Sequence, residues 1–320
     1  GQIVRYHGFA RGVGGNTGTP GLELMEKGCE LFVLEVSSYQ LETANPLPCE
    51  LAVLLNLSPD HLDRYDSVEA YYRTKAEIYA NCRKAVINRE LDFPLDISAP
   101  LVYSFGLTEP SGEFELGIEA SDEDQWLARG NERLMKARDL KIKGRHNQAN
   151  ALAALAVGYA MEFDEATMLE TLRTFKGLEH RCEYLGVRAG MEWFNDSKST
   201  NTGSTLAAME GLSTGDKNMI LILGGIDKGA DFSVMASSVN RYVKLLLVFG
   251  RDASRITARL EGSAPTFYCD DLVDVIGRAI EFGDEGDQVL FSPGCSSFDM
   301  FDNFEHRGRM FKTLLEEKVS

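Results

Sequence analysis

The first half of the sequence places possible metal ligands after two apolar runs that we expect to be strands. The run LFVLEVSS puts Glu35 near the end of a buried strand, and LAVLLNLSPDHLDRY puts Asp60 and His61 a few residues beyond another. At the carboxyl edge of a sheet, these side chains could hold Mg²⁺ or Mn²⁺. The alternative is structural, with Glu35 as a strand-end carboxylate whose hydrogen bonds are satisfied and Asp60 as a helix cap.

A lysine interrupts the apolar stripe of the helix predicted over residues 67–80. The stripe runs through Val68, Tyr71 and Tyr79 at helical spacing, and Lys75 occupies the position that should continue it. The ammonium either extends out to solvent along its own alkyl chain or is held inward for a purpose.

A glycine-rich segment, GVGGNTG at residues 12–18, lies between a predicted strand and a predicted helix. Its backbone N–H groups could meet an anion, or it could be a plain turn. The phosphate-binding motif G-x-x-x-x-G-K-[ST] occurs nowhere in the sequence. ATP binding through such a loop is therefore not predicted from these residues.

Three polar or glycine-rich loops of the second half are expected at the carboxyl ends of strands. The segment NDSKSTN at residues 195–201 comes just before a predicted helix, and GGIDKG at 224–229 and SPGCSS at 292–297 each follow a predicted strand. Together they predict an anion pocket to which Lys228 contributes charge and Ser297 a hydroxyl. Any one of them alone could be an ordinary turn between a strand and a helix.

The elements that must position these groups alternate between short apolar runs and helical patterns, which predicts parallel sheets covered by helices. Strands are expected at residues 11–14, 31–36, 51–56, 85–88, 101–105, 182–187, 219–223, 244–249, 265–268 and 288–292. Helices are expected at residues 20–27, 67–80, 147–161, 164–175, 202–211, 233–242, 253–261, 271–282 and 303–317. Residues 113–142 alternate like antiparallel strands and predict an appendage on the first sheet.

This alternation of strands and helices predicts an α/β protein of two doubly wound domains. Residues 1–177 form a central domain with a mixed or parallel sheet, and residues 178–320 form a Rossmann-like C-terminal domain. Residues 1–8 resemble the end of a helix with no capping signal before it. We therefore expect the chain to start inside an element, as a fragment would.

The composition argues against several classes of protein. The 33 Lys and Arg against 49 Asp and Glu give a formal net charge of −16, which disfavours nucleic-acid binding. No apolar run approaches the roughly 18–20 residues that span a bilayer, and the N-terminus has no signal-peptide pattern, so we expect a cytoplasmic protein. The six cysteines lack metal-site spacing, and Cys295 lacks the context of a nucleophile.

Nine motifs, in order along the chain, resemble those of the Mur ligases, and in particular the members that add D-glutamate. They are GVGGNTG, VLEVSSYQLET, LLNLSPDHLDRY, YYRTKAEIY, GRHNQANALAALA, HRCEY, NDSKSTN, LILGGIDKGADFS and SPGCSSFDMFDNFEHRGRMF. The resemblance implies an ATP-dependent ligase of peptidoglycan synthesis that joins D-glutamate to UDP-N-acetylmuramoyl-L-alanine. In that family ATP phosphorylates the acceptor carboxylate, the amine attacks the acyl phosphate, and phosphate leaves.

The resemblance also implies roles for individual residues of the first domain. Glu35 and His61 match ligands of Mg²⁺. Lys75 matches a lysine that CO₂ converts to a carbamate, an anion that binds the second metal ion. Asn16 and Ser37 match positions at the phosphate and acyl-substrate site.

Further roles are implied in the remaining part of the chain. Asn147 matches the adenine contact, Arg181 a phosphate contact and Asp196 a ribose contact. Two positions near the reacting groups are matched by Lys198 and Thr200. The residues that match the D-glutamate pocket are Thr200, Lys228, Ser297 and Phe304.

The sequence departs from the family because the N-terminal UDP-binding domain and the phosphate-binding loop are missing. We therefore expect the 320-residue chain by itself to lack ligase activity. We also expect a monomer. Two alternatives stay open. One is a non-catalytic module that binds nucleotide or amino acid, and the other is a sister ligase that uses a different amino acid.

Overall fold

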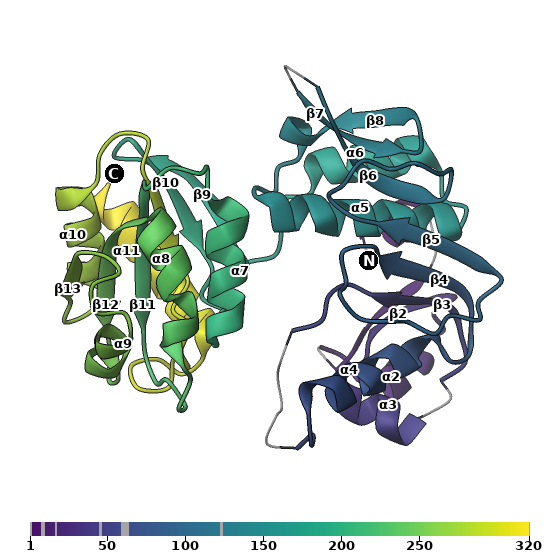
Figure 1. The fold of residues 1–320 in the computed structure, drawn as a ribbon, viewed down its shortest axis with the longest axis horizontal. Coiled ribbons are helices and arrows are strands. Elements are labelled where there is room, and N and C mark those ends of the chain that lie inside the picture. Colours follow the sequence, from purple (N-terminus) through teal and green to yellow (C-terminus); the bar gives the residue numbers. More distant parts are fainter. Residues whose placement is uncertain are drawn as a thin grey trace. The chain divides into compact units, whose positions relative to one another are not determined.

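The computed structural model describes residues 2–7, 10–16, 18–44, 47–58, 64–121 and 124–319. The chain divides into two compact units (Figure 1). The first contains Gly1–Lys141 and Gln148–Phe175, and the second contains Ile142–Asn147 and Lys176–Ser320. The predicted boundary between residues 177 and 178 lies close to the division after Phe175, and Ile142–Asn147 is the segment that crosses it.

The second unit is built on a six-stranded sheet. Its strands are β9 (Glu183–Arg188), β10 (Met191–Asn195), β11 (Met219–Gly224), β12 (Val243–Phe249), β13 (Thr266–Tyr268) and β14 (Gln288–Phe291). Their spatial order is β13-β12-β11-β14-β10-β9. Among these described strands β9 pairs antiparallel with β10, and the other pairs are parallel.

Helices cover both faces of this sheet, which confirms the doubly wound fold. The helices are α7 (Thr202–Leu212), α8 (Ala236–Tyr242), α9 (Ala253–Arg259), α10 (Leu272–Phe282) and α11 (Phe304–Lys318). Successive residues of a strand point to opposite faces. Leu221 and Leu223 therefore pack with α7, α8 and α9, whereas Ile220 and Ile222 pack with α10 and α11.

The strand β10 is absent from the sequence-based prediction. Its residues MEWFN carry a charged Glu192 and end on the polar Asn195, so the apolar run is too short to stand out. In the structure, Met191 and Trp193 are fully buried because β10 lies inside the sheet between β14 and β9. Tertiary position, rather than local pattern, makes this segment a core strand.

The first unit contains a second six-stranded sheet. Its strands, in spatial order, are β3 (Cys49–Leu54), β4 (Cys82–Asn88), β5 (Leu101–Phe105), β6 (Glu115–Ala120), β7 (Gln125–Arg129) and β8 (Glu132–Lys136). The pairs from β3 to β6 are parallel, and the pairs β6–β7 and β7–β8 are antiparallel. The predicted antiparallel appendage is therefore confirmed, as a continuation of the same sheet.

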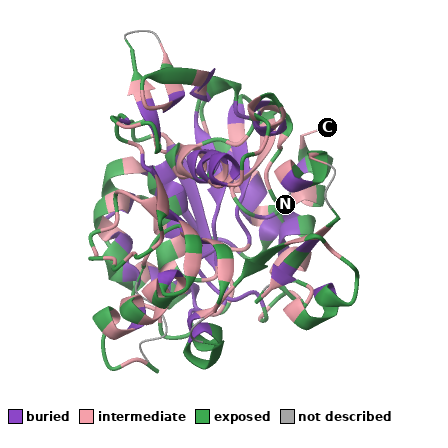
Figure 2. Ribbon diagram, turned by 90° about the vertical axis from the view of Figure 1, so that its right-hand side faces the viewer, coloured by how far each residue is buried: buried purple, intermediate pink, exposed green. Residues whose placement is uncertain are grey.

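Helices of the first unit are α1 (Gln2–Tyr6), α2 (Gly21–Met25), α3 (Ser38–Ala44), α4 (Val68–Ala76), α5 (Arg145–Ala160) and α6 (Glu165–Thr174). Buried residues, purple in Figure 2, lie on the strands and on the inner sides of helices. The helix α3 was not predicted, because Ser37 and Ser38 look like a turn in the sequence. Among the described residues, no helix is both long enough and apolar enough to cross a membrane.

The prediction that Glu35 ends a buried strand is wrong. The strands β1 (Arg11–Gly15) and β2 (Leu31–Glu35) form a parallel two-stranded sheet of their own. Phe32, Val33 and Leu34 are each about two-fifths exposed, at 39%, 38% and 44%. Apolar composition indicated burial, but within the described residues a two-stranded sheet offers these side chains little cover.

The glycines of residues 12–18 serve close packing as well as the turn. Residues 12–15 of this segment lie inside β1, whereas the sequence placed the segment after a strand. A Cβ at Gly14 would stand 2.0 Å from the carbonyl oxygen of Thr19, so only glycine fits there. Gly15 has a φ of 108°, a conformation that side chains disfavour, and it lies against the backbone of Glu35.

Candidate functional site

Three predicted loops of the second unit meet at the carboxyl edge of its sheet. They follow β10, β11 and β14, which run parallel in the order β11-β14-β10. The chain leaves β11 toward β12 and β13 and then returns to place β14 on the other side of β11. Ligands of open α/β sheets bind at such a reversal of strand order.

The loop after β10 is organised by a buried carboxylate. Asp196 is 5% exposed, and its side chain accepts hydrogen bonds from the hydroxyls of Ser199 (2.5 Å) and Ser292 (2.7 Å) and the backbone N–H of Cys182 (3.0 Å). Burial raises the pKa of Asp196, and the hydrogen bonds oppose this rise. The carboxylate therefore joins the loops after β10 and β14, and its ribose role stays a prediction.

The loops after β11 and β14 are paired to each other. Ile226 and Ser296 exchange two backbone hydrogen bonds of 2.9 Å each. This bridge brings together the segments that contain Lys228 and Ser297. Ser297 is 3% exposed, whereas Lys228 is exposed to solvent.

Lys228 is held in a left-handed backbone conformation with a φ of 51°. The preceding residue, Asp227, organises the turn, because its carboxylate accepts from the N–H of Gly229 at 3.0 Å and lies 3.3 Å from Arg255. The N–H of Asp227 in turn donates to Asp252 at 3.0 Å. The turn leaves Lys228 exposed to solvent. Its left-handed φ is a strained backbone conformation for a residue other than glycine.

The first loop also meets the start of α11. The hydroxyl of Ser197 donates to the carbonyl of Phe304 at 2.9 Å, and the ammonium of Lys198 lies 4.6 Å from the centre of the Phe304 ring. The structure thus brings Lys198 and Phe304 into contact. Thr200 is half-buried in the same loop.

A buried arginine beneath these loops is a residue that sequence reasoning missed. Arg307 in α11 is fully buried, and burial lowers the pKa of its guanidinium to about 10. Its hydrogen bonds reach all three loops, at Ser197, Gly224 and Cys295. The signal in the sequence was its place on the apolar stripe of α11 with Phe311 and Leu315, the same kind of signal that identified Lys75.

The predicted nucleotide contact Arg181 is exposed on a strained segment. Its neighbours His180 and Cys182 both have positive φ, of 64° and 43°. The Nδ1 atom of His180 lies 3.0 Å from the side-chain amide of Asn195, so both neighbours are tied to the end of β10. Asn147 lies in the first turn of α5, the part of that helix that belongs to the second unit together with Arg181 and Asp196.

In the first unit, the structure brings Asn16 and Glu35 together at the end of β1 and β2. The backbone N–H of Asn16 donates to the carbonyl of Glu35 at 2.7 Å, and its side-chain amide donates to the Glu35 carboxylate at 3.3 Å. Ser37 immediately precedes α3, and its hydroxyl accepts from the N–H of Gln40 in that helix at 3.2 Å. These three predicted residues therefore share one edge of the unit.

Lys75 lies half-buried on α4, and its ammonium is 5.4 Å from the centre of the Tyr71 ring. The helix α4 packs against α3, the helix that follows Ser37. His61, together with Asp60, lies outside the described residues. Within the described part of the chain, no cluster of three His, Cys, Asp or Glu side chains has the arrangement of a metal site.

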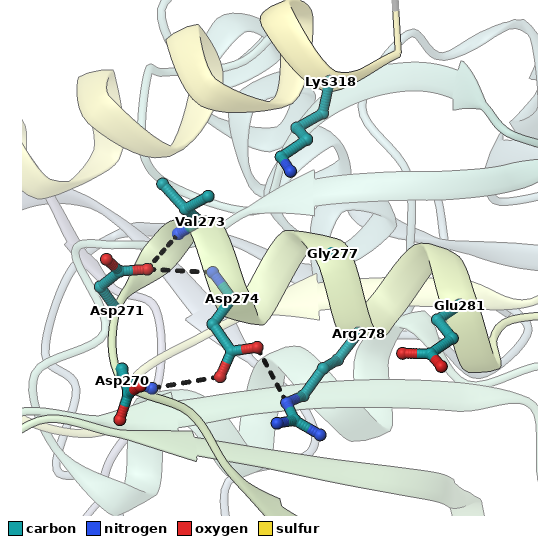
Figure 3. Close-up of a pocket in the computed structure, with 8 residues that line it drawn as sticks. All are labelled: Asp270, Asp271, Val273, Asp274, Gly277, Arg278, Glu281 and Lys318. Atoms are coloured by element: carbon teal, nitrogen blue, oxygen red, sulfur yellow. Dashed lines mark hydrogen bonds and ion pairs between the residues drawn. The ribbon is translucent and has the colours of Figure 1, made fainter.

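Two other features do not coincide with the predicted site. A surface pocket of about 460 Å³ runs along α10 and the end of α11 (Figure 3). None of the predicted site residues lines it; its lining is Asp270, Asp271, Val273, Asp274, Gly277, Arg278, Glu281 and Lys318.

Burial raises the pKa of the Cys295 thiol to about 12, which agrees with the expectation that Cys295 is not a nucleophile.

The sequence matches Mur ligase domains in both halves of the chain and is similar to known ligases. The Mur ligase middle domain matches residues 19–158, and the Mur ligase glutamate ligase domain matches residues 180–295. A UDP-N-acetylmuramoylalanine--D-glutamate ligase of Pseudomonas putida is 43% identical over 97% of this chain and 70% of its own length. The enzyme of the same name from Nitrosococcus oceani is 45% identical over 96% of this chain and 68% of its own length.

Solved structures show the same fold at lower identity. A pseudomurein peptide ligase type C from Methanothermus fervidus matches 99% of this chain and 75% of its own, with a TM-score of 0.71 and 16% identity. MurF ligase from Thermotoga maritima in complex with ADP matches 99% of this chain and 76% of its own, with a TM-score of 0.69 and 17% identity.

The two α/β units, the second with three loops gathered at a reversal of strand order, define a two-domain protein of the doubly wound class. Within that class, the chain belongs to the Mur ligase family and contains its middle and C-terminal domains.

Proposed function

We propose that the protein is an ATP-dependent ligase that adds D-glutamate to UDP-N-acetylmuramoyl-L-alanine in peptidoglycan synthesis. The observation that carries this proposal is the convergence of the loops after β10, β11 and β14 on one edge of the second unit. That arrangement occurs in a chain whose relatives at 43–45% identity are named D-glutamate ligases.

The amino-acid site is proposed to lie on these loops. D-Glutamate carries two carboxylates, and the ammonium groups of Lys198 and Lys228 and the hydroxyl of Ser297 are groups that bind carboxylates. Phe304 is proposed to bound the pocket on the side of Lys198, where the two side chains are 4.6 Å apart. Thr200 completes the predicted set from the loop after β10.

The nucleotide is proposed to contact Asn147, Arg181 and Asp196. Arg181 is exposed and cationic, which suits phosphate. The reaction is an acyl transfer in three steps. The acceptor carboxylate attacks the terminal phosphorus of ATP and ADP leaves; the amine of D-glutamate then attacks the acyl phosphate; phosphate leaves as the amide forms.

Mg²⁺ is the metal we propose for the first unit, with Glu35, His61 and a carbamate on Lys75 as its ligands. A carboxylate, a carbamate and an imidazole can bind a hard divalent cation, and Glu35 is an exposed carboxylate beside the Asn16 amide. The metal supplies positive charge that offsets the phosphate oxygens. Asn16 and Ser37 are proposed to position the phosphate and acyl groups beside it.

The test is ligation by the natural gene product that contains these 320 residues. Purified protein is incubated with ATP, UDP-N-acetylmuramoyl-L-alanine and one of D-glutamate, L-glutamate, L-alanine or a diamino acid, and both the UDP-linked product and phosphate are measured. We expect product with D-glutamate alone. Preference for another amino acid would identify a sister ligase, and retained nucleotide binding without any product would identify a binding module; both results reject the proposal.

A further inference from the structure

We propose that Arg307 is a positioning residue of the D-glutamate site, because its guanidinium fixes the three loops that form the site. This inference rests on the proposed function and names a residue outside the predicted pocket. Arg307 lies in the first turn of α11, one turn of helix beyond Phe304.

The contacts of the guanidinium span the whole site. Its Nε donates to the Ser197 hydroxyl at 3.0 Å, and one Nη donates to the Ser197 carbonyl at 2.7 Å. The other Nη donates to the carbonyls of Cys295 at 3.0 Å and Gly224 at 3.4 Å. One side chain therefore bonds the loops after β10, β11 and β14 at once, which the planar fork of arginine permits and the single ammonium of lysine does not.

These contacts are adjacent to the residues proposed to bind the substrate. Ser197 precedes Lys198 and also donates its hydroxyl proton to the Phe304 carbonyl at 2.9 Å. Cys295 is followed by Ser296, whose bridge to Ile226 joins the loops of Ser297 and Lys228. A shift of the backbone at any of the three points would therefore displace a substrate-binding group.

The charge of Arg307 has a further consequence for anion binding. Each hydrogen bond that the structure gives this guanidinium goes to a carbonyl or a hydroxyl oxygen, and none of these groups carries a negative charge. Two carboxylates, of Asp196 and Asp299, add to the field at the guanidinium. Both bond other groups: Asp196 accepts from two serines, and Asp299 accepts from the Arg251 N–H at 2.9 Å.

A buried cation surrounded mainly by neutral oxygens contributes positive potential to the loops above it. That potential favours a ligand with two carboxylates. The Arg307 guanidinium therefore both holds the three loops in place and adds positive electrostatic potential at them.

The experiment compares Arg307→Met and Arg307→Lys with Leu315→Ala, a matched control. Leu315 lies two turns further along the same buried face of α11, where it packs in the core away from the loops. Arg307→Lys keeps the charge and serves as the second variant if Arg307→Met does not fold. Amide hydrogen exchange is measured on the 320-residue chain, and KM values for D-glutamate and ATP are measured on the natural gene product.

We expect both Arg307 variants to exchange faster in residues 195–201, 224–229 and 292–297 than Leu315→Ala does. We also expect KM for D-glutamate to rise roughly ten-fold or more. KM for ATP should rise less, because the proposed nucleotide contact Asp196 is also held by Cys182, Ser199 and Ser292. Arg307→Lys should show the smaller rise in KM. The Leu315→Ala variant should lose thermal stability without this selective change in KM.

Equal exchange of the three loops in the Arg307 and Leu315 variants would overturn the inference. So would faster exchange accompanied by an unchanged KM for D-glutamate. A wild-type protein that does not ligate D-glutamate would instead reject the proposed function, and the exchange measurement would still decide whether Arg307 orders the loops.

Discussion

The ammonium of Lys198 lies 4.6 Å from the centre of the Phe304 ring, although Lys198 follows β10 and Phe304 begins α11. The Phe304 ring also packs against the His180 ring in a T-shaped arrangement, with ring centres 6.3 Å apart. Phe304 therefore lies between a cation of the loop and a buried histidine. A cation over an aromatic face is stabilised by about 0.5–1 kcal/mol at a site of this kind.

Replacing Phe304 with leucine should remove this interaction while keeping an apolar side chain. We expect KM for D-glutamate to rise roughly three- to ten-fold and the free energy of unfolding to fall by about 1 kcal/mol. Steady-state kinetics and urea unfolding measure the two effects. Phe282→Leu on α10 is the control, and an equal change in KM in both variants would contradict the prediction.

Lys228→Gly should separate backbone strain from charge. Glycine adopts a φ of 51° without penalty, so the free energy of unfolding should rise by up to about 1 kcal/mol. Affinity for D-glutamate should nevertheless fall, because the ammonium is lost. Ala189→Gly relieves a similar φ of 50° in the turn between β9 and β10 and should leave affinity unchanged. A destabilised Lys228→Gly protein would refute the strain argument.

Asp196→Ala should destabilise the second unit by roughly 2–4 kcal/mol, because two hydroxyls and one backbone N–H lose their buried acceptor. Chemical denaturation of the chain measures the change. Asp216→Ala, at an exposed position, should stay within about 0.5 kcal/mol of wild type. A similarly small effect at Asp196 would mean that its hydrogen bonds are dispensable.

Stability should fall as the solution becomes acidic through pH 6.5. Burial lowers the pKa of both His146 and His180 in the folded chain. The unfolded chain binds these protons near pH 6.5, so the contribution of neutral histidine is present above that pH and is lost as pH falls through the folded-state pKa. His146→Gln and His180→Gln should each flatten the dependence measured by urea unfolding between about pH 7.5 and 5.5. His306→Gln, at a side chain that is 37% exposed, is the control, and an unaltered slope in both buried variants would reject the prediction.

The proposed carbamate predicts an unusual response of Lys75→Ala. Turnover of the natural gene product should fall by more than about a hundred-fold, because an anionic metal ligand is lost. A small exogenous carboxylate should partly restore it by replacing that anion. Arg73→Ala, an exposed cation on the same helix, should keep its activity and show no response to carboxylate. Unchanged turnover in Lys75→Ala would mean that the ammonium merely extends to solvent.

Local patterns predicted most elements because their spacing reflects burial directly. The strand at residues 101–105 was predicted with the bounds of β5, and α7 and α10 differ from prediction by one residue at one end. The strand β10 and the helix α3 could not be predicted, since MEWFN and SSYQ carry weak local signals. In β10, burial comes from β14 and β9, which are distant in sequence.

By itself, the sequence determined the α/β class, the polar composition of the three loops and the unusual position of Lys75, because these depend on spacing and composition within one segment. Only the tertiary structure decided that β2 is exposed, that Asp196 joins two loops and that Arg307 bonds three. Those properties depend on pairings between residues far apart in the chain. A single arginine on an apolar stripe looks like an exception in the sequence. It is explained by carbonyl oxygens of Gly224 at the end of β11 and of Ser197 and Cys295 in the neighbouring loops.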